Sequence, residues 1–195
     1  MENKPSSTPI SLIVDNVSIK PIDLSKMVSI RKRSKKVMKT NKKTLGKSIE
    51  ERPEYINDRS EFGHWEIDLV LGKKTKSEAV MLTLVERQTR YALGVKLEDK
   101  QSQTINRAVT HLISQYPIAS ITADNGSEFS LLSDLKAVDV YFAHPYSSHE
   151  RGTNENFNGL LREYVPKGIS LNPLTSEELD NDITAINERL RRLLQ

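Results

Sequence analysis

Three carboxylates stand at places in this sequence where chemistry explains them better than solvation does. Asp68 lies in the middle of the apolar segment WEIDLVL, where an unpaired buried charge is costly. Asp124 directly follows the apolar residues 118–123 and opens an Asp-Asn-Gly turn, and ligands of α/β sheets collect at such strand ends. Glu155 lies further along, in a segment with helical periodicity. Three carboxylates from separate elements suit hard divalent cations, which prefer oxygen ligands.

Glu155 faces away from the apolar side of its expected helix. If Phe157 marks the centre of that apolar side, Glu155 lies about 160° around the helix from it. Arg162, seven residues further on, shares the face of Glu155. We therefore expect this face to offer a carboxylate and, along the same line, a cation that can contact a substrate phosphate.

The chemistry that such a set favours is phosphoryl transfer. Two divalent cations about 3.5–4 Å apart can hold both the attacking and the leaving oxygen of an in-line displacement. We predict that Asp68, Asp124 and Glu155 are the catalytic residues and the metal ligands of a site of this kind. Spacing alone leaves two rivals, because Glu66 could replace the first residue and Glu128 the second.

The elements that carry these residues follow from periodicity. Alternation and short apolar runs predict strands over 64–71, 79–85 and 91–97, and their brief links favour an antiparallel meander. The later elements are expected to be helices over 102–116, 130–136, 153–164 and 175–194, and strands over 118–123 and 138–143. This order, β-β-β-α-β-α-β-α-α, predicts an α/β fold with a mixed five-stranded sheet and helices on both faces.

Two local signals indicate where helices begin. Ser102 is available as the N-cap of the first long helix. Thr175 and Glu178 have the spacing of a capping box, which predicts the start of the last helix.

The net charge of +3 conceals an uneven distribution. Residues 1–50 contain 12 Lys and Arg against 4 Asp and Glu, a net charge of +8, whereas residues 51–195 contain 17 against 22, a net charge of −5. Nine of the bases lie within residues 31–47, a stretch without acids. Like charges at this density keep a segment extended until a polyanion neutralises them, so we expect a flexible arm that contacts nucleic acid. A solvated basic linker is the alternative.

Composition argues against several classes of protein. The sequence has no cysteine, so a disulfide framework, a thiolate zinc site and a cysteine nucleophile are excluded, and a reducing compartment fits. No run of 18 apolar residues occurs, and residues 1–10 lack the pattern of a secretory signal. We therefore expect a cytoplasmic protein that does not interact with membranes.

Three segments resemble the catalytic core of bacterial insertion-sequence transposases, specifically the insertion-sequence-thirty family. They are SIEERPEYINDRSEFGHWEIDLVLGK, ITADNGSEF and VYFAHPYSSHERGTNENFNGLLREYVPKG. The resemblance covers about residues 48–190. It is specific, because the DNG-x-EF turn and the PYSS-x-ERGTNEN-x-NGLLR run are very hard to reach together by chance.

The resemblance implies a ribonuclease-H-like fold with a DDE-type catalytic triad, which maps onto Asp68, Asp124 and Glu155. It implies a DNA transposase that holds two Mg²⁺ ions, with Mn²⁺ as a substitute. Such an enzyme hydrolyses a phosphodiester at the element end and then joins the freed 3′-hydroxyl to target DNA, which is DNA integration and recombination. A homo-oligomer is expected on the same ground.

We expect DNA contacts from both parts of the chain. Contacts beside the triad are expected from Arg162, Lys167, Asn125 and Asn158. Contacts from the arm are expected from Arg31, Lys32, Arg33, Lys35 and Lys36.

The family pattern also defines the expected domains. Residues 1–50 are expected to form a basic, mostly irregular arm or linker, and residues 55–195 an integrase or transposase core that is truncated at its C-terminal end. Full-length relatives carry an N-terminal helix-turn-helix region, and residues 1–30 show no pattern for one. Two further functions therefore stay open, which are an inactive DNA-binding remnant of a transposase and a ribonuclease that cleaves RNA–DNA hybrids.

Overall fold

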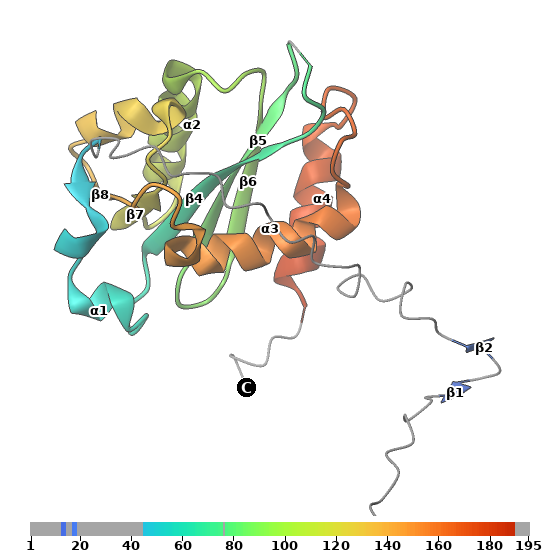
Figure 1. Cartoon of the computed structure of the whole chain (residues 1–195), viewed down its shortest axis with the longest axis horizontal. Helices are drawn as coiled ribbons and strands as arrows, with labels where there is room; N and C mark the ends of the chain where they lie inside the picture. Colours follow the sequence, from blue (N-terminus) through green and yellow to red (C-terminus); the bar gives the residue numbers. More distant parts are fainter. Residues whose placement is uncertain (1–12, 15–16, 19–44, 76, 190–195) are drawn as a thin grey trace, which may run out of the picture. The chain divides into compact units, whose positions relative to one another are not determined.

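The computed structural model describes residues 13–14, 17–18, 45–75 and 77–189 (Figure 1). The chain divides into two compact units, Met1–Thr40 and Asn41–Gln195. In the first unit, strands β1 (Ile13–Val14) and β2 (Val17–Ser18) pair antiparallel. The second unit contains the residues of the predicted site. Among the described residues, no helix is long and apolar enough to cross a membrane.

A six-stranded mixed sheet forms the centre of the second unit. The expected meander is confirmed, since β4 (His64–Leu71), β5 (Val80–Glu86) and β6 (Ala92–Leu97) pair antiparallel in sequence. On the other side of β4, β7 (Ser120–Ala123) and β8 (Asp139–Phe142) continue the sheet in parallel. The strand order is β3-β8-β7-β4-β5-β6, so β4 has one parallel and one antiparallel neighbour.

The sheet has one strand more than the five expected, because β3 (Lys47–Ser48) adds to its edge. This pair of residues has no apolar alternation that would indicate a strand. It pairs parallel with β8, where Lys47 lies opposite Tyr141, and Lys47 Nζ lies 2.6 Å from Asp139 Oδ1. A 3-10 helix, η2 (Ile49–Glu51), follows it. The end of the segment expected to be an irregular arm therefore belongs to the sheet.

Helices cover both faces of the sheet (Figure 1). One face is covered by α2 (Ser102–Gln115) and the 3-10 helix η3 (Ser127–Asp134). The other face is covered by α3 (Gly152–Tyr164) and α4 (Ser176–Asn187). This arrangement confirms the α/β fold class with helices on both faces.

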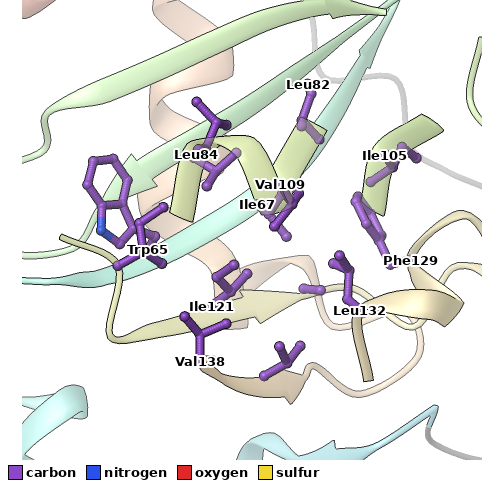
Figure 2. Packing of buried hydrophobic residues seen from close by; sticks show 14 of the residues in the cluster. Trp65, Ile67, Leu82, Leu84, Ile105, Val109, Ile121, Phe129, Leu132 and Val138 are labelled. Atoms are coloured by element: carbon purple, nitrogen blue, oxygen red, sulfur yellow. The ribbon is translucent and has the colours of Figure 1, made fainter. Parts of the chain in front are cut away.

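The larger hydrophobic core lies between the sheet and α2 with η3. Figure 2 shows Trp65 and Ile67 of β4 facing Val109 of α2 and its neighbours, with Phe129 and Leu132 of η3 closing the side. These side chains are almost fully buried. Burial of this kind contributes about 1.5–3 kcal/mol for each large apolar side chain, so this core fixes the position of β4.

The smaller core lies on the opposite face, between the sheet and α3 with α4. It contains Val70 of β4, Phe157 and Leu161 of α3, and Ile183 of α4. Since strand side chains alternate between faces, the residues at positions 66, 68 and 70 of β4 share this face. The predicted catalytic Asp68 is therefore carried to the α3 side of the sheet.

Several helix ends differ from the expectation. Gln101 is the N-cap of α2 and forms no side-chain cap bond, so the expected N-cap Ser102 is the first helical residue. The capping box of Thr175 and Glu178 is confirmed at the start of α4. Residues 190–194 of the expected last helix lie outside the described residues. Sequence patterns missed three short helices, which are η2, α1 (Glu54–Asn57) and the 3-10 helix η4 (Ser148–Arg151).

Candidate active site

Asp68 lies in the middle of β4, as expected, and its carboxylate reaches the surface beside α3. The side chain is 27% exposed, so substrate or an ion can approach it. The amide of Leu69 donates to Asp68 Oδ1 at 2.9 Å. From α3, Asn158 Nδ2 donates to Asp68 Oδ2 at 2.9 Å. Both carboxylate oxygens are thus oriented by neighbouring groups.

Asp124 follows β7, the strand that runs parallel beside β4. In their register Glu66 lies opposite Thr122, so Asp68 and Asp124 continue the same alignment two residues further on. The amide of Gly126 donates to Asp124 Oδ1 at 2.9 Å and closes the turn. The parallel pairing therefore carries two of the predicted catalytic residues to the same end of the sheet.

One guanidinium joins these two carboxylates. Arg151 Nη1 lies 3.2 Å from Asp68 Oδ1, and Arg151 Nη2 lies 3.5 Å from Asp124 Oδ2. The same Nη1 donates to the carbonyl of Ile67 at 3.2 Å. Arg151 stands at the end of η4, directly before α3. The residues around Arg151 in the ERGTNEN run do not predict this contact, because it depends on the turn between η4 and α3.

The surroundings of Asp68 hold its pKa above that of an exposed aspartate. Burial raises the pKa of Asp68 above its ordinary value, and the nearby charge of Asp124 adds to the rise. The positive charge of Arg151 and the hydrogen bond from the Leu69 amide oppose it without cancelling it. A cation that approaches this carboxylate would stabilise its ionised form.

Glu155, the third predicted catalytic residue, lies exposed on α3. It stands four residues after Arg151 and three before Asn158, and both of these side chains contact Asp68. Its face of the helix adjoins the face that meets the two aspartates. Among the described residues, however, no three His, Cys, Asp or Glu side chains are close enough together to hold a metal ion. The structure brings Asp68 and Asp124 together, and the role of Glu155 stays a prediction.

Glu66, the rival for the first position, has a different environment. It is fully buried, with Oε1 2.5 Å from Arg87 Nη1 and Oε2 accepting from the amide of Asn154 at 3.0 Å. Asn154 Nδ2 also donates to the carbonyl of Glu66 at 3.0 Å. Because both carboxylate oxygens are engaged inside the protein, Glu66 holds the start of α3 on β4 rather than facing substrate. The second rival, Glu128, lies on η3, and its Oε2 accepts from Ser127 Oγ at 3.5 Å.

Comparisons with known proteins identify the family. Residues 58–148 match the family described as integrase core domain, a span that includes Asp68 and Asp124. The chain is 61% identical over 177 residues to a probable transposase for the insertion-like sequence element IS1161 of Streptococcus salivarius, covering 91% of this chain and 52% of that protein. It is 40% identical over 156 residues to the transposase InsI of the insertion sequence element IS30A of Escherichia coli strain K12, covering 77% and 40%. The chain belongs to the IS30 family of transposases.

The fold of this IS30-family chain is also found among solved structures. It is similar to the catalytic core domain of BIV integrase, with a TM-score of 0.51 and 15% identity over 66% of this chain and 86% of that one. The expected ribonuclease-H-like fold is thereby confirmed. The IS30-family chain spans about half the length of its S. salivarius relative.

The residues predicted to contact DNA in the IS30-family chain have different environments in the structure. Arg162 uses Nη1 and Nη2 to bind the carbonyls of Val165 and Leu71, at 3.3 and 2.8 Å. Lys167 is exposed after α3. Asn125 Oδ1 accepts from the amide of Leu45 at 3.0 Å. The predicted contacts of the arm, Arg31, Lys32, Arg33, Lys35 and Lys36, lie outside the described residues.

Asp68 in the middle of β4 and Asp124 directly after β7 offer groups that fit a divalent cation. Their donor groups are carboxylates, the ligands that Mg²⁺ and Mn²⁺ prefer. A positive charge, the guanidinium of Arg151, already lies between Asp68 and Asp124. The chemistry of these two carboxylates is therefore compatible with a divalent cation, and the metal site of the IS30-family chain stays a prediction.

Proposed function

We propose that this chain carries the catalytic core of a DDE transposase, a metal-dependent polynucleotidyl transferase that cleaves and joins DNA strands. The observation that carries the proposal is the sharing of one guanidinium by Asp68 and Asp124. Two acids from neighbouring parallel strands converge on a partly exposed point, where the guanidinium of Arg151 lies between them. Membership of the IS30 family and of the integrase core domain supports the same reaction class.

In this proposal Asp68, Asp124 and Glu155 hold two Mg²⁺ ions, and Mn²⁺ can replace them. The bound ions supply an activated water and stabilise the charge that develops on the attacking and leaving oxygens. The protein supplies the positions of these ligands. Asn158 orients the carboxylate of Asp68. The parallel register of β4 and β7 places Asp68 level with Asp124.

The start of α3 is held in place from inside the protein. Glu66 binds the amide of Asn154 and the guanidinium of Arg87 in the buried region below the site. Glu155 follows Asn154 directly, so a fixed helix start limits where Glu155 can lie. We propose that this buried network keeps the third carboxylate within reach of the first two.

DNA is the proposed partner, both as element end and as target. Lys167 offers an exposed cation after α3, Arg162 on α3 binds the carbonyl of Leu71 at the end of β4, and Asn125 follows β7. The basic residues 31–36 would contact phosphates without reading sequence. We further propose that the protein acts in the cytoplasm as a homo-oligomer, in line with the family resemblance.

The test is DNA cleavage and joining by the full chain. Purified protein is incubated with supercoiled plasmid and a labelled oligonucleotide that ends in a 3′-hydroxyl, with Mg²⁺, Mn²⁺ or EDTA. We expect nicking and joining that need a divalent ion and that Asp68→Asn, Asp124→Asn and Glu155→Gln each abolish. Asp180→Asn, on the exposed surface of α4, is the matched control and should leave both reactions unchanged.

Two results would contradict the proposal. The first is cleavage that persists in Asp68→Asn, which would remove the carboxylate from the reaction. The second is salt-sensitive plasmid binding without cleavage under any metal condition, which is the behaviour of a DNA-binding remnant. If Asp68→Asn and Asp124→Asn lose activity but Glu155→Gln keeps it, only the role of Glu155 as the third ligand is contradicted.

A further inference from the structure

Arg151 neutralises two acids that the fold forces together. Asp68 and Asp124 come from adjacent parallel strands and lie on the same guanidinium, at 3.2 and 3.5 Å. Two carboxylates held side by side repel each other unless a positive charge lies between them. In this chain the positive charge comes from the residue that immediately precedes α3.

The surroundings of Arg151 indicate that the two carboxylates determine its position. Its side chain is 11% exposed, and its Nε is buried without a hydrogen-bond partner among the described residues. Buried polar groups are usually hydrogen-bonded, so an unpaired guanidinium nitrogen needs an explanation. Here Nη1 and Nη2 meet Asp68, Asp124 and the carbonyl of Ile67, and Nε is left over.

A divalent cation and this guanidinium need the same oxygen atoms. Mg²⁺ binds oxygen at about 2.0–2.1 Å, much closer than the contacts of Arg151, and the two positive charges repel each other. A metal ion on both carboxylates therefore requires Arg151 to withdraw from at least one of them. Because η4 contains no buried residue, we expect that the Arg151 side chain can turn away from the carboxylates.

We propose that Arg151 is a positioning residue that holds Asp68 and Asp124 together before metal binds and competes with divalent ions for them. The inference rests on the proposed function, because it takes these two carboxylates as metal ligands. When a binding-competent state is populated only part of the time, the apparent dissociation constant rises in proportion. The fraction of time that Arg151 spends on the carboxylates thus determines the metal concentration at which the site is half filled.

The experiment measures metal binding rather than activity. Mn²⁺ binding to the full chain is followed by electron paramagnetic resonance, and the Mg²⁺-dependent rise in melting temperature is recorded beside it at constant ionic strength. The variants are Arg151→Gln, Arg151→Lys and Asp68→Asn. The matched control is Arg189→Gln, which removes an equal charge where Arg189 meets Glu163 and Tyr164, each at 3.0 Å.

We expect Arg151→Gln to lower the dissociation constant for Mn²⁺ about ten-fold, as it would if Arg151 occupies the site about nine-tenths of the time. Without metal this variant should melt earlier than the parent, and Mg²⁺ should raise its melting temperature by more. Arg151→Lys should lie between the two, because it keeps the charge but loses the planar fork. Arg189→Gln should bind Mn²⁺ like the parent.

Different results overturn the two proposals. If Asp68→Asn abolishes Mn²⁺ binding while Arg151→Gln and Arg151→Lys bind it as the parent does or more weakly, the competition is refuted and the metal site stands. If Asp68→Asn binds Mn²⁺ as tightly as the parent, the metal site itself is refuted, and the role of Arg151 falls with it.

Discussion

Asn158 on α3 donates a hydrogen bond of 2.9 Å to Asp68 on β4, and so connects the helix directly to the central carboxylate. The Oδ1 of the same amide accepts from Thr83 Oγ1 at 3.4 Å. Thr83 is the residue opposite Asp68 on β5. The carboxylate is therefore oriented by a side chain that is itself held by the neighbouring strand, as supporting residues of metal sites commonly are.

Replacing this amide tests its role. We predict that Asn158→Ala lowers the rate of Mg²⁺-dependent DNA nicking by about 10–100-fold, the usual effect of losing a group that orients a metal ligand. DNA affinity, measured by fluorescence anisotropy, should change little, because the amide of Asn158 is engaged with Asp68, although the sequence pattern predicted a DNA contact for it. Asn181→Ala, on the exposed side of α4, serves as the control. A nicking rate equal to that of the parent would show that Asp68 needs no support from α3.

The buried pair of Glu66 and Arg87 gives a prediction about stability. Glu66→Gln leaves the guanidinium of Arg87 buried without its anion, and breaking a buried pair from one side costs about 3–5 kcal/mol. We expect the free energy of unfolding in urea to fall by that amount. Adding Arg87→Met to Glu66→Gln should restore part of it. If the single variant loses less than about 1 kcal/mol, the pair contributes no more than a surface ion pair does.

The strands show how far sequence patterns lead. The bounds of β4 were predicted at both ends, because its polar and apolar residues alternate from His64 to Leu69 and two further apolar residues follow. β3 could not be predicted, because Lys47 and Ser48 carry no pattern of their own and become a strand only through the edge of β8. The start of α2 was predicted at Ser102, but its N-cap is Gln101, whose backbone is extended and which makes no side-chain cap bond.

The residues of the candidate site likewise fall into those that the sequence predicted and those that only the structure reveals. Asp68 and Asp124 were chosen because a charge within or directly after an apolar strand needs an explanation, and both lie where that argument placed them. Arg151 was not chosen, because nothing in its neighbours indicates which distant groups it meets. Glu66 was a rival on spacing alone, and only the contacts with Arg87 and Asn154 separate its role from that of Asp68.

The raised pKa of Asp68 gives a prediction about pH. Burial is the largest cause of the rise, so the folded chain binds this proton more tightly than the unfolded chain. Stability therefore falls as the pH rises from the ordinary aspartate value of 3.8 through the raised value in the folded protein. Asp68→Asn removes this ionisation. We expect the metal-free variant to melt above the parent at pH 7 and the difference to shrink towards pH 3.

Calorimetry in a chelating buffer checks this prediction, with Asp180→Asn as the control. Asp180 is exposed on α4, so its replacement should not change how the melting temperature depends on pH. If Asp68→Asn instead melts below the parent at pH 7, the ion pair with Arg151 outweighs the cost of burying the carboxylate.

Two glycines should respond in opposite ways to the same substitution. Gly94 on β6 faces α4, and a Cβ there would overlap the side chain of Ile183. Gly94→Ala should therefore destabilise the protein by about 1–3 kcal/mol, as overpacking commonly does. Gly159 lies within α3 and a Cβ there would meet nothing within 4 Å. Gly159→Ala should stabilise by about 0.5–1 kcal/mol, because alanine favours the helix. Urea denaturation measures both changes, and a stabilised Gly94→Ala would show that α4 packs less closely against β6 than the structure has it.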